Sequence, residues 1–347
     1  MCGLTPNQRG HEYVSCFHPL FAEQKGFTEN GKPRYIPVKL DQQNFDFQYS
    51  KEILRLRKET DNKAIWIPCG RCIGCRLDKS REWALRCMME LKTCENGLAS
   101  FITLTYNESS VPISYYPDPD TGEALPSLTL RLDDLQKFWK RLRKSIPDKK
   151  IRYFACGEYG SETWRPHYHA IIFGYKPDDL VKTQQNDTNA YFSSKTLQKI
   201  WTYGNVIVAG VNFDTCAYVA RYTAKKACTL GDEFYEKFNL EKPFLVMSRR
   251  PGIGWSYFKE KESTWKNDRI YISGPDPVDG NIPRSFLQKL EELDPEVAQY
   301  IHNNRELKET VYERAIVQSA KVPYSKLLKD SEEYLLRKSK AISRNKL

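Results

Sequence analysis

The sequence lacks the features that define membrane, secreted and repeat proteins. Its longest apolar stretches, such as residues 170–173 and 206–211, fall far short of the roughly 20 residues that cross a bilayer. No basic and then apolar leader opens the chain, so we expect no secretion. The chain shows no internal repeat and no low-complexity tract. We therefore expect a soluble protein inside the cell with no membrane partner.

Composition and charge narrow the class further. Hydrophobic residues make up 40% and aromatic residues 13% of the 347 residues, which excludes an extended disordered chain and predicts one or two domains with a buried core. The formal net charge is +10, and between residues 131 and 152 nine Lys or Arg face three Asp. Both a solvated helix face and a surface that binds a polyanion fit this pattern.

The ten cysteines do not form the pattern of a disulfide framework. Cys69, Cys72 and Cys75 follow a C-x₂-C-x₂-C spacing, which is typical of a metal site. A zinc ion would need a fourth ligand, and Cys16 and His18 are the candidates. An iron–sulfur cluster and free thiols are the alternatives. We predict a small structural zinc element at Cys16, Cys69, Cys72 and Cys75.

Hydrophobic periodicity predicts an α+β fold with one sheet backed by helices. Strands are expected at residues 99–106, 151–157, 167–173 and 204–213. Helices are expected at residues 80–92, from 133 onward, at 216–228, 284–303 and 326–343, with a short one at 51–58. Residues 107–127 are expected to form a loop and residues 175–195 a polar insertion.

Two of the five histidines, His167 and His169, lie two residues apart in a predicted strand. Side chains alternate along a strand, so both imidazoles point to one face and could hold one divalent ion. Glu158 ends the preceding strand and would join them if the two strands form a hairpin. Two imidazoles and one carboxylate suit Mg²⁺ or Mn²⁺ with positions left for a phosphate. Polar-face histidines and an ordinary loop acid are the alternatives.

Tyr218 and Tyr222 lie four residues apart on a predicted helix and therefore share one face. Lys225 follows on that face two turns beyond Tyr218. A buried aromatic pair with outward lysines explains the spacing without any chemistry. Alternatively, the tyrosines are nucleophiles. A phenol with a pKa of about 10 then needs a metal that polarises the phosphate and a lysine that stabilises the developing charge.

These segments occur in the order of the three motifs of HUH endonucleases, and the chain resembles that family. The motifs are the strand 101–106, Pro166-His-Tyr-His169, and the helix with its two tyrosines. Paired tyrosines resemble rolling-circle initiators of small single-stranded DNA phages. Residues 68–76 and 248–254 resemble the replication initiators of gokushoviruses, a branch of the microviruses. The resemblance implies an HUH endonuclease core at residues 96–262, with a central antiparallel sheet flanked by helices. It leaves an N-terminal region at 1–95 and a mostly helical extension at 263–347.

The resemblance also implies roles for individual residues. The metal ligands for Mg²⁺ or Mn²⁺ would be Glu158, His167 and His169. The catalytic residues would be Tyr218, Tyr222 and Lys225. The first motif is regarded as structural, so Thr103 and Thr105 have no implied catalytic role. Contacts to the DNA backbone are expected from Arg71, Arg76, Lys137, Lys140, Arg141 and Lys226.

The implied activity is a metal-dependent DNA nickase with strand-joining activity in the cytoplasm of a bacterial host. One tyrosine would attack viral origin DNA that is single-stranded or melted, forming a 5′-phosphotyrosine bond. The released 3′-hydroxyl would prime the host polymerase during rolling-circle replication. No G-x-x-x-x-G-K-[ST] motif occurs, so a host helicase and single-strand binding protein are implied partners. The alternatives are a non-catalytic, zinc-stabilised single-stranded DNA-binding protein and a plasmid-type initiator or relaxase of the same fold.

Overall fold

The computed structural model describes residues 16–29, 31, 33–41, 43–46, 64–160, 162–185, 190–225, 231–261, 265–266, 268–274, 277–319 and 322–344. Side chains are not described at residues 222–225, 309–310, 312–314, 316–318 and 339–344. The predicted helix at 51–58 lies outside the described residues. The chain forms two compact units, one of residues 79–265 and 269–282 and one of residues 1–78, 266–268 and 283–347. The proposed division at residues 95 and 262 stays a prediction.

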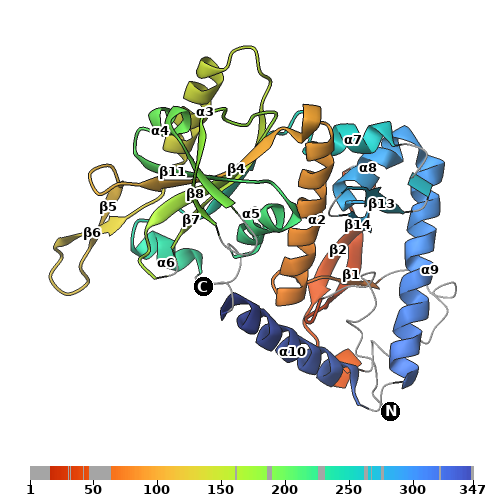
Figure 1. The fold of residues 1–347 in the computed structure, drawn as a ribbon. Helices are drawn as coiled ribbons and strands as arrows, with labels where there is room; N and C mark the ends of the chain where they lie inside the picture. The colour runs from red at the N-terminus through yellow and green to blue at the C-terminus, as the bar shows by residue number, and fades with distance from the viewer. Residues whose placement is uncertain are drawn as a thin grey trace. The chain divides into compact units, whose positions relative to one another are not determined.

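The larger unit is built on a seven-stranded sheet of order β12-β7-β8-β4-β11-β10-β9 (Figure 1). Its strands are β4 (Ala99–Tyr106), β7 (Arg152–Tyr159), β8 (Pro166–Phe173), β9 (Leu180–Gln185), β10 (Ala190–Ser194), β11 (Gly204–Ala209) and β12 (Phe244–Met247). Each neighbouring pair is antiparallel. Its helices are α3 (Leu132–Ser145), α4 (Lys195–Ile200), α5 (Phe213–Lys225), α6 (Asp232–Lys237) and α7 (Trp255–Glu260). The α+β class with a central antiparallel sheet is confirmed.

The main hydrophobic core lies between one face of this sheet and helices α3 and α4. Leu135, Phe138 and Leu142 recur at helical spacing on α3 and are fully buried against Leu104 and Tyr168 of the sheet. Burial of each such side chain contributes about 1.5–3 kcal/mol relative to exposure. Because side chains alternate along a strand, this core face leaves the neighbours of Tyr168 on the opposite face of β8.

A buried polar cluster fixes β8 within this core. The hydroxyls of Tyr106 and Tyr168 lie 2.6 Å apart, and Tyr106 donates to the Asp134 carboxylate at 2.9 Å. The Tyr168 hydroxyl donates to the Arg131 carbonyl at 2.8 Å and accepts from the Arg131 N–H at 3.0 Å. Burial raises the pKa of both tyrosines above the usual value, so their hydroxyls stay protonated. Tyr168, between the two histidines of interest, is therefore held in place.

Two predicted loops are wrong, and one predicted helix is broken. Residues 175–195 contain β9 and β10. Only β9 is an edge strand, which can carry polar side chains on both faces, and β10 pairs with β9 and β11 over five residues. Residues 107–127 contain the hairpin β5 (Ile113–Pro117) and β6 (Ala124–Leu128), whose free edges tolerate proline. The helix predicted at 284–303 is α8 (Arg284–Leu293) followed by α9 (Pro295–Ser319). Asp294 is extended because it precedes a proline.

The smaller unit has its own three-stranded sheet, of order β2-β1-β3. Its strands are β1 (Leu20–Phe27), β2 (Pro33–Val38) and β3 (Ala64–Ile67), and its C-terminal part contains α8, α9 and α10 (Tyr324–Arg344). Helix α2 (Ile73–Lys92) starts in this unit. The remaining elements, η2 (Glu95–Gly97), β13 (Arg269–Ile272) and β14 (Val278–Asn281), belong to the larger unit. None of the helices in the described ranges is both long enough and apolar enough to cross a membrane.

Candidate functional site

A carboxylate and two imidazoles meet on the sheet face opposite the main core. Strands β7 and β8 form a hairpin in which Glu158 pairs with His167 and Cys156 with His169. The Nε2 atoms of His167 and His169 lie 2.9 and 3.0 Å from the same oxygen, Oε1 of Glu158. Neighbouring ligand atoms around a six-coordinate ion at roughly 2.1 Å would be about 3 Å apart. The spacing of the three groups therefore fits a small divalent cation.

The hydrogen bonds of the imidazoles also favour a cation at this point. Nδ1 of His167 donates to the Arg165 carbonyl at 3.1 Å, since a carbonyl can only accept. In a neutral ring the remaining Nε2 is then an acceptor, yet it faces the Glu158 carboxylate, which is also an acceptor. Such a contact is favourable only when a proton or a metal ion carries positive charge between the two atoms.

Glu158 is the most strongly constrained member of the group. Its side chain is only 6% exposed, and two imidazoles are its closest charged partners. Burial alone would raise the pKa of Glu158, but hydrogen bonds and positive charge from His167 and His169 outweigh burial and hold that pKa below its usual value. A buried carboxylate that stays ionised beside two imidazoles is well suited to a metal ion.

Thr103 contacts His169, one of the candidate metal ligands, an interaction that sequence reasoning missed. Its Oγ1 lies 2.9 Å from Nδ1 of His169, and the two residues are direct partners in the pairing of β4 with β8. The contact turns the opposite nitrogen of the ring toward Glu158. The sequence alone could not reveal this contact, because it depends on the register between β4 and β8, which is known only once the two strands are known to pair.

Replacing Thr103 by Val should weaken Mn²⁺ binding about 10- to 100-fold, the usual cost of losing an outer-shell partner of a ligating histidine. Isothermal titration calorimetry measures the affinity, and the melting temperature reports folding. Thr105→Val is the matched control, because Thr105 pairs with His167 in the same strands but its hydroxyl donates to the Asn205 carbonyl. Equal Mn²⁺ affinities for the two variants would show that Thr103 does not position His169.

Helix α5 brings Tyr218 to this group. The Tyr218 hydroxyl lies 3.5 Å from Nε2 of His169, and the two rings meet edge-on with centroids 5.0 Å apart. Phe101 stacks on His169 and also meets the Tyr218 ring edge-on, and α5 packs on β7 and β8. Tyr222 and Lys225 lie on the same helix, but their side chains are outside the described residues, as is Lys226.

The four predicted cysteines also come together, within the smaller unit. One ligand atom from each of Cys16, Cys69, Cys72 and Cys75 lies within 4.8 Å of every other. The Sγ atoms of Cys69 and Cys75 are 4.0 Å apart, close to the spacing of about 3.8 Å around a tetrahedral ion with bonds of about 2.3 Å. His18 instead pairs with Glu332 at 2.7 Å. The cysteine group could hold a metal ion.

Backbone N–H groups surround these sulfur atoms. Cys69 donates to Cys16 Sγ at 3.2 Å, Cys72 donates to Cys69 Sγ at 3.4 Å, and Phe17 donates to Cys72 Sγ at 3.4 Å. Hydrogen bonds from the Cys16 and Cys75 thiols hold the pKa of Cys72 well below its usual range. The same thiol contacts raise the pKa of Cys16, whereas the backbone N–H donors favour the thiolate, the form in which cysteine binds metals.

The three predicted DNA-contacting residues of α3 do not lie at the His/Glu group. Lys137, Lys140 and Arg141 lie on α3, which covers the opposite face of the sheet. Lys137 pairs with Asp133 at 2.6 Å, and Arg141 donates to Thr202 and lies over the Tyr203 ring. Arg71 and Arg76 flank the cysteine group in the smaller unit. Their role in DNA binding stays a prediction.

Part of the chain matches a known protein family. The family model for replication-associated proteins of the ORF2 type matches residues 99–227. That range starts at β4 and contains Glu158, both histidines and both tyrosines. The matched part of the chain is therefore that of a replication-associated protein.

Relatives extend the match over most of the chain. The replication-associated protein ORF2 of Spiroplasma virus 4 is 33% identical over 78% of this chain and 82% of its own length. The replication-associated protein VP4 of Bdellovibrio phage phiMH2K is 30% identical over 82% of this chain and 79% of its own length. ORF4 of Chlamydia phage 1 is 27% identical over 67% and 56%, respectively. The chain belongs to the ORF2 family of replication-associated proteins of these microviruses. No solved structure matches it.

Proposed function

We propose that this replication-associated protein nicks and rejoins viral single-stranded or melted DNA through a tyrosine-linked intermediate, as an HUH endonuclease. The observation that carries the proposal is the Tyr218 hydroxyl, 3.5 Å from His169 in a group of two imidazoles and one carboxylate. A nucleophile, a cation site and an outer-shell partner thus share one face of the sheet. The phage relatives supply the context of DNA replication.

Glu158, His167 and His169 would hold Mg²⁺ or Mn²⁺. The bound ion would polarise the scissile phosphate and stabilise the charge that develops there. The chain's own residues do the rest. Buried Glu158 and the Thr103 contact fix the imidazoles, and the rings of Phe101 and His169 position the Tyr218 phenol. The nucleophile is therefore held in place before DNA binds, which lowers the entropic cost of attack.

In the proposed reaction the phenol oxygen of one tyrosine forms a bond to phosphorus, and the bond from phosphorus to the 3′-oxygen breaks. The released 3′-oxygen regains a proton, so that a 5′-phosphotyrosine and a 3′-hydroxyl remain. One phosphodiester replaces another, so no nucleotide is consumed. Tyr222, one helical turn beyond Tyr218, would serve a second transfer that closes the circle. Host polymerase, helicase and single-strand binding protein would act on the exposed 3′ end.

We propose a structural zinc ion for the cysteine group. Four thiols at tetrahedral spacing with N–H donors at the sulfur atoms suit Zn²⁺. All four sulfur ligands come from the protein, so this ion would have no free position for a substrate. Its role would be to stabilise the smaller unit, separate from the His/Glu group.

The test is a covalent-adduct assay with end-labelled single-stranded fragments that tile a viral genome, with Mn²⁺ or EDTA. A 5′-phosphotyrosine predicts that the label at the 3′ end of a fragment moves to the protein, whereas a 5′ label leaves on a free fragment. Removing both phenols in Tyr218→Phe/Tyr222→Phe should lower adduct formation at least about 10³-fold. The single variants identify the tyrosine that acts first.

Tyr271→Phe is the matched control, because Tyr271 is exposed on β13 and lies outside the His/Glu group. It should form the adduct at the wild-type rate. DNA binding without any adduct on any fragment would refute the nickase and favour the non-catalytic binding protein. Transfer of the 5′ label instead would reverse the polarity proposed for the linkage.

A further inference from the structure

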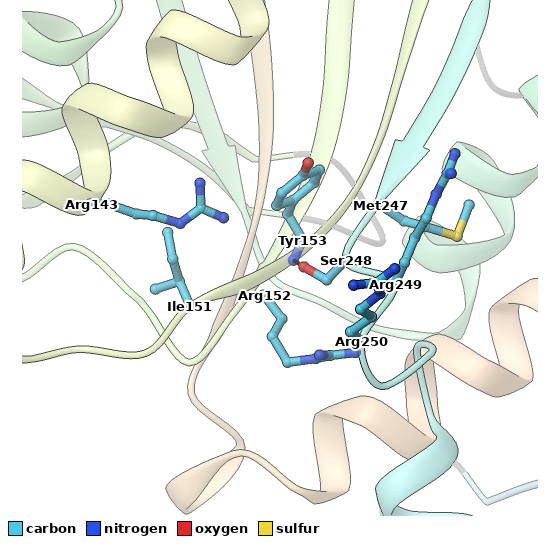
Figure 2. A pocket seen from close by; sticks show the side chains of 8 residues that line it. All are labelled: Arg143, Ile151, Arg152, Tyr153, Met247, Ser248, Arg249 and Arg250. Carbon is cyan, nitrogen blue, oxygen red and sulfur yellow. Dashed lines mark hydrogen bonds between the residues drawn. The ribbon is translucent and has the colours of Figure 1, made fainter.

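A hollow lies at the end of β7 that is remote from Glu158. It has a volume of about 640 Å³, and four of its lining residues are arginines: Arg143, Arg152, Arg249 and Arg250. Figure 2 shows Arg143 reaching in from α3 on one side of Tyr153, with Arg249 and Arg250 of the segment after β12 on the other. Glu158 lies six positions along β7 from Arg152, or about 20 Å away at roughly 3.3 Å per residue.

The positive charge of this hollow is largely uncompensated. Arg152 pairs with the buried Glu90 and donates to the Pro251 carbonyl at 2.6 Å. Within the described ranges, no carboxylate lies at ion-pair distance from Arg143, Arg249 or Arg250, and no acidic residue lines the hollow. Three like charges around one hollow repel one another unless an anion binds between them.

The segment that carries Arg249 and Arg250 is fixed rather than loosely attached. Ser248 N–H donates to the Tyr153 carbonyl at 2.9 Å, and Tyr153 N–H donates to Ser248 Oγ at 3.1 Å. Further along, Gly254 N–H donates to Glu90 at 2.7 Å. The two arginines are therefore presented from a backbone anchored at both ends. Such preorganisation lowers the ordering cost of binding.

The aromatic wall of the hollow favours backbone contacts over base reading. Tyr153 already stacks on Trp139, with ring centroids 4.3 Å apart and planes 14° apart. The Arg143 guanidinium lies 5.7 Å from the Tyr153 ring. Guanidinium groups match phosphate oxygens in pairs, and the arginines come from three separate segments around an open hollow. This arrangement fits the phosphates of an extended strand better than one small anion.

We propose that this arginine hollow binds the phosphodiester backbone of single-stranded DNA, independently of sequence, at a point remote from the His/Glu group. The identity of the polymer rests on the function proposed above, whereas the anion site does not. A strand engaged at both places would be held firmly while its scissile phosphate lies at Tyr218. Binding at the hollow itself needs neither the metal nor the tyrosines.

Fluorescence anisotropy with single-stranded DNA of random sequence, in EDTA and over a range of salt concentrations, tests the proposal. Arg249→Gln/Arg250→Gln should lower affinity about tenfold or more at low salt. If one phosphate contact is lost per arginine, the salt slope falls by about 1.4, since each contact on a single strand contributes roughly 0.7. Arg249→Lys/Arg250→Lys should retain most of the salt dependence of DNA affinity, because lysine keeps the positive charge at both positions.

Two adjacent residues of α3 provide a matched pair. Arg143→Gln should weaken binding several-fold. Lys144→Gln removes the same charge from an exposed neighbour that does not line the hollow, and should change affinity less than twofold. An equal loss of DNA affinity from the two substitutions would show that net charge alone, and not the hollow, determines binding. That result would overturn the proposal. Unchanged affinity and slope in the Arg249/Arg250 double variant would overturn it as well.

The outcome is separable from that of the nicking assay. Binding is measured in EDTA, where no adduct is expected to form, and Tyr271→Phe, a change outside both sites, should bind this DNA like wild type. In one outcome the wild-type protein forms no adduct in the nicking assay while the arginine variants lose DNA affinity. That pair of results would support the DNA-binding hollow and reject the nickase. Inorganic phosphate and a deoxynucleoside triphosphate are the competitors. Displacement of DNA by either, beyond that of chloride at equal ionic strength, would indicate a small-anion site instead and reject DNA as the ligand.

Discussion

Replacing His169 by Ala is expected to lower metal-dependent adduct formation at least about 10³-fold. The side chain is 7% exposed, and its Nε2 contacts both Glu158 and Tyr218, at 3.0 and 3.5 Å. The substitution would remove a proposed metal ligand and the ring against which the Tyr218 phenol rests. Loss of several kcal/mol of charge stabilisation in the transition state corresponds to a rate effect of this size.

Single-turnover adduct assays give the rate, and calorimetry gives the Mn²⁺ affinity. His302→Ala is the matched control, since His302 is exposed and pairs with Glu291 at 3.0 Å, apart from the His/Glu group. Glu158→Gln provides a second variant of nearly unchanged volume, which should also lose Mn²⁺. Wild-type Mn²⁺ affinity in both His169→Ala and Glu158→Gln would disprove the metal site, whatever the nicking rate.

Replacing Cys72 by Ser is expected to destabilise the smaller unit by more than about 4 kcal/mol and to release one zinc ion per chain. Cys72 is 7% exposed, accepts an N–H hydrogen bond from Phe17, and lies within 4.8 Å of three further thiols. The binding free energy of a structural zinc ion contributes directly to the free energy of unfolding. Loss of one zinc ligand therefore lowers the free energy of unfolding. The core of the larger unit should keep its own stability.

Zinc content by mass spectrometry and thermal unfolding with and without a chelator measure this effect. Limited proteolysis shows which unit opens, with cleavage expected at residues 16–78 and not in the seven-stranded sheet. Cys94→Ser is the matched control, because Cys94 is half-buried outside the cysteine group. Purified wild-type protein without zinc, together with wild-type stability of Cys72→Ser, would leave the four thiols as a metal-free cluster.

The proximity of the candidate metal ligands could be predicted from sequence because it depends on two local rules. Alternation along β8 places His167 and His169 on one face, and a hairpin places Glu158 beside them. Cys69, Cys72 and Cys75 followed from spacing, whereas the structure decides between the two candidates for the fourth position and brings Cys16 to the group. These features need only the order of residues within one or two neighbouring elements.

The features that could not be predicted depend on pairing between distant segments. Thr103 contacts His169 only because β4 lies next to β8, and Arg143 meets Arg249 only because α3 and β12 converge on β7. The edge strand β9 carries too few apolar residues to show a strand pattern, and β10, of five residues between β9 and β11, is too short to show a clear one. Placing the basic cluster of α3 also needed the fold, since its amphipathic pattern does not reveal which sheet face it covers.

The position of Tyr168 has a consequence for how this family can change over time. The residue between the two histidines is anchored by hydroxyl contacts to Tyr106 and Arg131 on the other side of the sheet. Insertion or deletion of one residue in β8 would exchange the two faces, directing a histidine into the apolar core and the tyrosine toward Glu158. Such a slip would cost stability as well as the ligand set. Selection for a folded protein therefore preserves the strand register that keeps both histidines on one face of β8. This holds even in lineages where the activity of the protein is under weak selection.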